Sequence, residues 1–221
     1  MDAIGTKDLF DLKHTRAAQM LESCEYPWEA LDRIEETVRT IGTSLSKEEY
    51  DEVRDGVWIA KTAVVFPTAT ILPPAVIGKD TEVRPGAFIR GSVLVGDGAV
   101  VGNSTELKNC ILFDAVQVPH YNYVGDSILG YKAHMGAGAI TSNVKGDQKD
   151  VVIKGEKQYP TGRMKCGAML GDHAEIGCGS VLNPGTVIGR NTQVYPLSSV
   201  RGVIAANCIV KGERGVFNKT K

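Results

Sequence analysis

The sequence has few aromatic residues and no long apolar run. Aromatic residues make up 6% of the 221 residues, although 43% are hydrophobic. A core poor in aromatics and rich in Val, Ile, Ala and Gly favours stacked short strands over a helical globule. No apolar run approaches the roughly 18 residues of a membrane span, and the N-terminus lacks the basic start and apolar middle of a signal peptide. We therefore expect a soluble, cytoplasmic protein without a membrane partner.

Paired cysteines and a strong charge imbalance are also missing. The five cysteines are odd in number and none forms a Cys-x-x-Cys pair, which argues against a disulfide framework or a cysteine zinc site. We expect most of them to fill small buried positions. The formal net charge of −1 gives no overall attraction to nucleic acid, so no nucleic-acid partner is expected.

Residues 1–55 suit a small helical segment. Short helices are predicted at 16–23 and at about 27–42, where apolar residues form one stripe at positions 31, 34, 38 and 41. Pro27 suits a first helical turn, and Gly42 suits a stop. Since a stack of strands exposes unpaired edges at its ends, we expect this segment to cover the N-terminal end of the stack or to dock on a face.

A six-residue period follows. Every sixth residue is aliphatic, at positions 59, 65, 71, 77, 83, 89, 95, 101 and 107, and the period returns at positions 170, 176, 182, 188, 194 and 200. Three such hexads make one 18-residue turn of a triangular parallel β-helix, with the aliphatic side chains stacked inside. We predict this all-β coil over residues 56–205, followed by a tail at 206–221 that frays or caps it.

The period breaks after Leu107. The next inward candidates are Val118, Val124, Leu129 and Met135. Regular scaffolds tend to depart from their pattern at functional sites. Because His120 lies inside this break, we predict that residues 118–143 form an active site.

The repeats resemble those of hexapeptide-repeat transferases, which fold as a left-handed parallel β-helix and usually form trimers. The segments VGNSTELKN, VPHYNYVGDSILG and GAGAITSN resemble the acetyltransferase domain of bacterial N-acetylglucosamine-1-phosphate uridyltransferases. They resemble even more closely the C-terminal domains of archaeal sugar-1-phosphate nucleotidylyltransferases. The resemblance covers about residues 57–205. It implies a homotrimeric, acetyl-CoA-dependent N-acetyltransferase that acts on an amino-sugar 1-phosphate, glucosamine 1-phosphate first, and that needs no metal.

Site residues follow from the same resemblance. It implies that His120 is the general base, a task that suits a neutral imidazole near pH 7. Glu106 matches a glutamate that can orient the histidine. The backbone of three small residues matches the part that approaches acetyl-CoA: Gly136, Ala137 and Gly138. Four further residues match side chains that bind the sugar phosphate: Lys108, Tyr123, Asn143 and Lys149.

An arginine is also implied beside the phosphate, with two candidates. Arg84 stands in RPGA, which looks like the bacterial motif, and Arg90 stands in FIRG. Arg90 precedes Lys108 by 18 residues, one full turn of the coil, so the two side chains should stack on one outer face. We favour Arg90, because a phosphate requires both charges to converge.

The chain departs from the family pattern at two positions. His134 stands where the bacterial enzymes have a sugar-binding asparagine, and Val144 replaces a tyrosine. The amino sugar therefore stays open between glucosamine, galactosamine and another sugar. Residues 144–166 lack the period and carry six basic against three acidic residues, which suggests a projecting hairpin. This insert could be a solvated loop, a basic arm near the coenzyme A phosphates or a clasp on the next subunit.

Two other functions remain as alternatives. A zinc carbonic anhydrase on the same scaffold needs three histidine ligands, but the spacing of the four histidines does not show that family's pattern: His14, His120, His134 and His173. The other alternative is a non-catalytic or nucleotide-sugar-binding β-helix module associated with a sugar nucleotidyltransferase. A module of that kind has no need for the intact set of site residues, which favours the enzyme.

Overall fold

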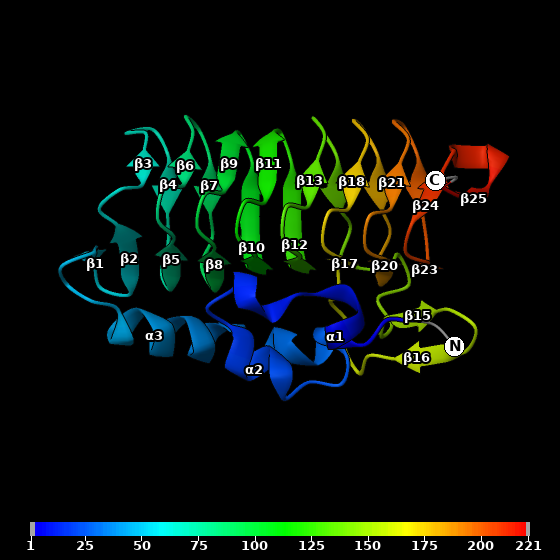
Figure 1. Cartoon of the computed structure of the whole chain (residues 1–221), viewed down its shortest axis with the longest axis horizontal. Helices are drawn as coiled ribbons and strands as arrows, with labels where there is room; N and C mark the ends of the chain where they lie inside the picture. The colour runs from blue at the N-terminus through cyan, green and yellow to red at the C-terminus, as the bar shows by residue number, and fades with distance from the viewer. Residues whose placement is uncertain (1–2, 220–221) are drawn as a thin grey trace.

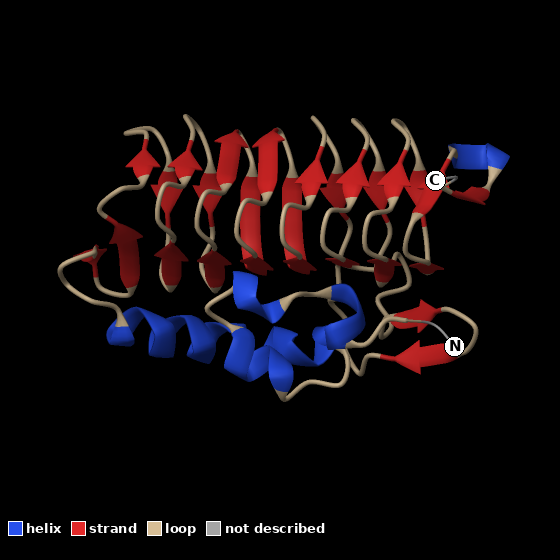
Figure 2. Ribbon diagram, in the orientation of Figure 1, coloured by secondary structure: helices blue, strands red, loops and turns tan. Residues whose placement is uncertain are grey.

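The protein folds as a left-handed parallel β-helix with helices along one side (Figures 1 and 2). The structure, a computed structural model, describes residues 3–219. Strands from successive turns pair in parallel and form three flat faces joined by three rows of corners. No helix within the described residues is long and apolar enough to cross a membrane.

Each face is a ladder of short strands. The first face contains β2 (Val57–Ala60), β5 (Ala75–Ile77), β8 (Val93–Val95), the second halves of β10 (Glu106–Leu112) and β12 (Tyr123–Leu129), β17 (Ala168–Leu170), β20 (Thr186–Ile188) and β23 (Val203–Ile204). The second face contains β3 (Val64–Val65), β6 (Glu82–Val83), β9 (Val100–Asn103), β11 (Gln117–His120), β13 (His134–Met135), β18 (Glu175–Ile176), β21 (Gln193–Val194) and β24 (Cys208–Val210). The third face contains β4 (Thr70–Ile71), β7 (Phe88–Ile89), the first halves of β10 and β12, β14 (Ile140–Thr141), β19 (Val181–Leu182) and β22 (Ser199–Val200).

Antiparallel strands flank the two ends of the coil. β1 (Tyr50–Arg54) pairs with β2 at one end. At the other end β25 (Val216–Asn218), which follows a short 3-10 helix η3 (Gly212–Arg214), pairs with β24. Both strands occupy edges that would otherwise be unpaired, so residues 206–219 cap the coil.

The hexad aliphatics form the core, as predicted. From Ile71 to Leu107 and from Leu170 to Val200 they are buried, whereas Ile59 and Val65 in the first turn are partly exposed. Burying one such side chain stabilises the fold by about 1.5–3 kcal/mol. Four of the five cysteines are also buried, as expected; Cys178 is exposed.

The period shortens within the two intervals where the sequence showed a change of step, Leu107–Val118 and Val124–Leu129. Leu107 is followed by Leu112 as the next buried inward residue, and Val124 by Leu129, so two hexads are shortened to five residues. These hexads stack on each other with a 17-residue register. His120 lies outside them, in a regular hexad, so the expectation that it sits inside the break is wrong. The sequence does not reveal the first shortened hexad, because residues 110–113 are all apolar and any of them could be the inward residue.

The N-terminal segment contains α1 (Thr6–Leu9), η1 (Leu12–His14), α2 (Ala18–Glu22), η2 (Pro27–Asp32) and α3 (Ile34–Ser44). The single helix expected at 27–42 is therefore a 3-10 turn and an α-helix that meet at Arg33. Gly42 does not stop the helix. It lies inside α3 against Trp58, whose ring a Cβ at Gly42 would approach to 2.1 Å.

This segment docks on the first face, which decides between the two predicted placements (Figure 1). Helix α3 contacts β5, β8 and β10, and η2 contacts β12. Ile34 and Val38 point into this interface and are fully buried. Among the described residues, the helices of this segment therefore cover the first face and not the second.

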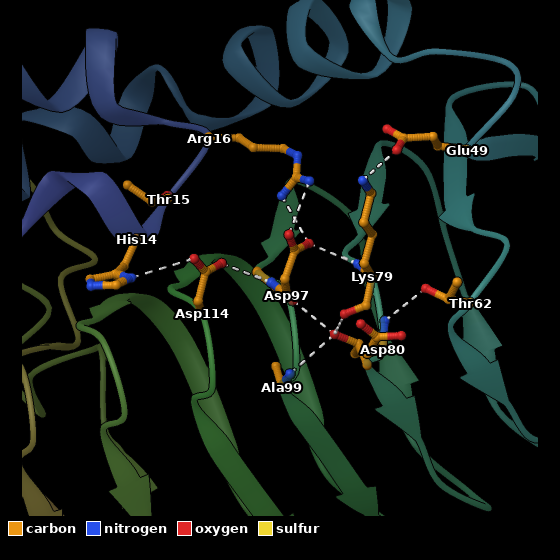
Figure 3. A network of polar contacts seen from close by, with 12 residues as sticks. His14, Thr15, Arg16, Glu49, Thr62, Lys79, Asp80, Asp97, Ala99 and Asp114 are labelled. Atoms are coloured by element: carbon orange, nitrogen blue, oxygen red, sulfur yellow. Dashed lines mark hydrogen bonds and ion pairs between the residues drawn. The ribbon is translucent and has the colours of Figure 1, made fainter.

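Polar contacts hold one margin of the segment to the corners between the first and second faces (Figure 3). Arg16 forms an ion pair with Asp97 at 2.9 Å, and His14 lies 3.8 Å from Asp114. Each of these carboxylates also accepts a backbone N–H from the preceding turn, Asp97 from Lys79 at 2.7 Å and Asp114 from Asp97 at 2.8 Å. Burial raises the pKa of Asp114, because desolvation disfavours the ionised form.

The insert forms the predicted hairpin, β15 (Val152–Lys154) and β16 (Gln158–Pro160), but it does not project. Tyr159 is 8% exposed and packs edge-on against Tyr26 and Trp28. Arg163 forms an ion pair with Asp32 of η2. The hairpin thus folds against the chain's own helices, because its aromatic and buried apolar residues outweigh its surface charges.

Candidate functional site

His120 is the last residue of β11 and begins a corner between the second and third faces. Its side chain is exposed. The carbonyl oxygen of His120 accepts the backbone N–H of Gly138 from the next turn at 3.0 Å. The structure therefore brings the predicted base and the predicted acetyl-binding backbone together at one place, the histidine corner, which comprises residues 119–122 and 136–139.

Asn122 ties the histidine corner together, although the sequence analysis did not single it out. Its side chain is 2% exposed. The side-chain oxygen accepts the backbone N–H of His120 at 3.1 Å, and the amide nitrogen donates to the carbonyls of Gly136 (2.8 Å) and Ala139 (3.0 Å). One buried amide thus satisfies three backbone groups and fixes the backbone of His120 against the next turn.

The small residues of the histidine corner allow close packing and leave its rim open. A Cβ at Gly136 would lie 2.7 Å from the backbone nitrogen of Cys178. Ala137 and Gly138 are exposed, and Gly138 adopts φ +70°. Gly136 donates its N–H to Ile176 and Gly138 donates to His120. Within residues 3–219 the N–H of Ala137 has no protein acceptor, so it is free to bind a ligand.

The predicted phosphate cations stack as expected. Strands β7 and β10 pair with Phe88 opposite Glu106, and the N–H of Arg90 donates to the carbonyl of Leu107 at 2.8 Å. Arg90 and Lys108 therefore occupy the same corner in successive turns. Arg90 forms an exposed ion pair with Glu106 at 2.6 Å.

Arg84 points elsewhere. It follows β6 of the second face and forms an ion pair with Glu82 at 3.0 Å. Its place is in the row of corners that contains His120, not in the row that contains Lys108. Arg90, and not Arg84, therefore shares a row of corners with Lys108; its role at a phosphate stays a prediction. Glu106, considered as a partner that orients His120, instead contacts Arg90.

The carboxylate of Asp126, which the sequence analysis did not single out, lies at the corner between the third and first faces. Asp126 is 2% exposed. Its Oδ2 accepts from Asn143 Nδ2 at 2.5 Å and lies 3.3 Å from Lys108 Nζ, while its Oδ1 accepts from Asn109 Nδ2 at 2.8 Å. A spacing of 17 residues, equal to the local turn length, separates Asn109, Asp126 and Asn143, and this spacing was the signal that could have revealed the group. We call Lys108, Asn109, Asp126 and Asn143 the carboxylate cluster.

Tyr123 adjoins the carboxylate cluster. Its hydroxyl oxygen accepts from Asn143 Nδ2 at 3.3 Å. Burial raises the pKa of Tyr123, and the negative charge of Asp126 raises it further. The phenol therefore keeps its proton at neutral and mildly alkaline pH and can donate it to an anionic oxygen.

Lys149, also predicted to bind the substrate, lies away from the contacts of the carboxylate cluster. It is exposed in the loop before β15, where its backbone N–H donates to Asp147 Oδ1 at 3.1 Å. No described contact joins its side chain to the carboxylate cluster. Its assignment therefore rests on the sequence resemblance.

The other histidines lie in separate surroundings. His134 pairs with Glu175 at 2.8 Å on the second face. In the strand ladder it lies opposite Gln117, three residues before His120. His14 stacks on Tyr131 with ring centroids 3.6 Å apart, and His173 meets the same ring edge-on. Within residues 3–219 no group of three or more His, Cys, Asp or Glu is placed to hold a metal ion.

Comparisons with known proteins agree with this architecture. A family model described as the GMPPB C-terminal domain matches residues 71–158. Over 88% of its length the chain is 31% identical to the bifunctional protein GlmU of Methanococcus aeolicus, of which it covers 48%. Over 51% of its length it is 32% identical to the bifunctional sugar-1-phosphate nucleotidylyltransferase/acetyltransferase of Sulfurisphaera tokodaii, of which it covers 28%. The chain resembles hexapeptide-repeat acyltransferases of the GlmU type.

The resemblance to GlmU-type acyltransferases covers only part of those proteins, since the chain spans less than half the length of either relative. Among solved structures, a hexapeptide transferase family protein from Anaplasma phagocytophilum aligns over 75% of this chain and 81% of its own, at 16% identity and a TM-score of 0.42. A likeness at that level carries no functional argument.

Proposed function

We propose that the protein is an acetyl-CoA-dependent N-acetyltransferase that acts on an amino-sugar 1-phosphate, with glucosamine 1-phosphate as the first candidate. One observation carries the proposal. The exposed His120 and the open backbone of Ala137 and Gly138 meet at one corner, and the cationic and polar side chains suited to a sugar phosphate lie on the adjoining third face. The GlmU-type resemblance supports the same reaction class.

In the proposed reaction, His120 takes a proton from the sugar amine as its nitrogen attacks the thioester carbonyl. The tetrahedral intermediate then collapses, the carbon–sulfur bond breaks, and coenzyme A leaves as a thiolate that receives the proton. The scaffold contributes mainly by holding amine and thioester in reacting geometry. A general base of this kind typically contributes about 10²–10⁴-fold to the rate.

The thioester oxygen gains negative charge as the amine attacks. A backbone N–H aimed at that oxygen lowers the barrier, because it needs no reorganisation during the reaction. Ala137 offers such a group, since both neighbouring amides already donate to backbone carbonyls. We assign the oxyanion contact to the N–H of Ala137.

The sugar phosphate is proposed to bind between Arg90 and Lys108. The exposed Arg90–Glu106 pair contributes only about 0–1 kcal/mol, so an incoming phosphate can take the guanidinium from Glu106. Lys108 is only 26% exposed and is held by Asp126, and it therefore provides a fixed charge. The Tyr123 hydroxyl donates a further hydrogen bond. Lys149 and the homotrimer remain part of the proposal through the family resemblance.

The test is thiol release from acetyl-CoA with glucosamine 1-phosphate and galactosamine 1-phosphate. His120→Ala should lower turnover by about 10²-fold or more. His173→Ala, which removes an exposed histidine that meets the ring of Tyr131 edge-on, should leave turnover within a few-fold of the wild type. Equal turnover in wild type and His120→Ala would move the base elsewhere. No turnover with any amino-sugar phosphate would favour the non-catalytic module.

A further inference from the structure

We propose that Asp126 is a positioning residue, which holds Lys108 and Asn143 ready for the phosphate and sugar before the substrate arrives. The inference rests on the proposed function, which assigns those two side chains to substrate binding. Asp126 itself is too deeply buried to touch the substrate. It acts through its neighbours.

The contacts of Asp126 account for both of its carboxylate oxygens. Oδ2 receives the amide of Asn143 and faces the ammonium of Lys108, while Oδ1 receives the amide of Asn109. A buried carboxylate loses its hydration and retains the donors that replace it. Lys108 and Asn143 therefore keep one arrangement, unlike Arg90, which is itself exposed and is held only by the half-buried Glu106.

The backbone explains why this carboxylate stands here. Each of the two shortened hexads turns its corner through a left-handed residue, Asn109 at φ +47° and Asp126 at φ +48°. Short polar side chains tolerate this conformation better than other residues with a Cβ. Because the two corners stack, the amide of Asn109 is brought beneath the carboxylate of Asp126.

Other parts of the chain hold this corner in place. Asn109 Nδ2 also donates to the carbonyl of Leu31 in η2 at 3.2 Å. The insert leaves and rejoins the coil directly beside Asp126, since the N–H of Cys166 donates to the carbonyl of Asn143 at 3.0 Å and that of Gly167 donates to the carbonyl of Asp126 at 2.7 Å. The N-terminal segment and the insert thus meet at the residue that orients the proposed substrate ligands.

The kinetic test uses Asp126→Asn, which suits the left-handed backbone and removes the charge together with one of the two acceptor oxygens. The KM for the amino-sugar 1-phosphate should rise about tenfold or more, as for a lost charge-assisted contact, while the KM for acetyl-CoA stays within about twofold. Asp80→Asn is the matched control, because Asp80 is an exposed residue with φ +54° in another row of corners. In a Lys108→Met background, Asp126→Asn should raise the KM much less than it does alone. Additive effects would point to general destabilisation and overturn the proposal.

A second measurement does not depend on turnover. Crystal structures of the ligand-free wild type and of Asp126→Asn should show Lys108 and Asn143 leaving their places in the variant. Side chains that stay in place would overturn the positioning role even if the KM rises. If the wild type acetylates no amino-sugar phosphate, the proposed function fails, and these two structures still decide whether Asp126 orients its neighbours.

Discussion

The side-chain oxygen of Asn122 accepts the backbone N–H of His120 at 3.1 Å, while its amide nitrogen bridges the carbonyls of Gly136 and Ala139 in the next turn. His120 is therefore held from within the coil, although its imidazole is exposed. This buried amide, together with the hydrogen bond from the Gly138 N–H to the His120 carbonyl, sets the distance between the proposed base and the acetyl-binding backbone.

Replacing Asn122 by Ala should lower both stability and turnover. Buried backbone groups would lose their partner, which costs about 1–3 kcal/mol in the free energy of unfolding. Because the corner loosens, kcat should also fall. Urea denaturation and thiol release measure the two effects. Ser198→Ala is the control, since Ser198 is buried at the equivalent corner of a later turn and donates to Tyr195 at 2.7 Å. An unchanged kcat in a folded Asn122→Ala protein would contradict the role of the corner.

The two candidate arginines can be separated by matched substitutions. Arg90→Met should raise the KM for the amino-sugar 1-phosphate by about tenfold or more, because a phosphate loses one of two converging charges. Arg84→Met removes an equal charge from the other row of corners and should change this KM by less than about twofold. Steady-state kinetics with saturating acetyl-CoA gives both values. A larger effect from Arg84→Met would reverse the assignment.

The packing of α3 on the first face predicts a steric effect at Gly42. Gly42→Ala would place a methyl group against the ring of Trp58. Overpacking of this kind typically costs about 1–3 kcal/mol, so the urea midpoint should fall. Gly146→Ala serves as the control, because a Cβ at Gly146 meets nothing within 4 Å. Equal midpoints for Gly42→Ala and the wild type would show that α3 can shift away from Trp58 without loss.

The burial of Asp114, at the margin where the N-terminal segment docks, predicts that the stability of the protein depends on pH. Burial raises its native-state pKa above the ordinary 3.8, so the native state binds this proton more tightly than the unfolded state does. The resulting penalty is present at pH 7 and disappears as the pH falls through the raised pKa towards 3.8. Asp114→Asn, which retains an oxygen for the N–H of Asp97, should therefore be more stable than the wild type at pH 7.

The advantage of Asp114→Asn should shrink as the pH approaches 4. Urea denaturation of both proteins between pH 7 and pH 4 measures it. Asp55→Asn, at an exposed position, should show no such trend. If Asp114→Asn instead gains stability relative to the wild type as the pH falls, the attraction of Asp114 to Arg16 and His14 outweighs the cost of its burial.

The coil was predictable because its aliphatic residues repeat in sequence. Positions such as Ile77 and Val95 recur at a fixed step and need no knowledge of what lies beside them. The five-residue step from Val124 to Leu129 was visible in the sequence. The step from Leu107 to Leu112 was not, because several apolar residues around Leu112 could equally point inward. The role of Gly42 was also missed. A glycine is needed there because the ring of Trp58, 16 residues further along the chain, packs against α3 at that point.

The candidate site was predictable in part for a related reason. His120, Lys108, Tyr123 and Asn143 stand in motifs that a resemblance can match one at a time, and the structure places the last three together. Asp126 stands in the same motif, but its importance arises from neighbours one turn before and one turn after it. Such lateral contacts become visible only when the local turn length is known to be 17 residues.

The insert leaves the coil at Asn143 and returns at Cys166, and a hydrogen bond closes its base. The strands on either side, β14 and β17, pair with β12 as though the intervening residues were absent. Residues can therefore be added to or removed from the insert without changing the number of turns in the coil. A shortened or exchanged segment here would alter what packs against η2 while leaving the register of every turn unchanged.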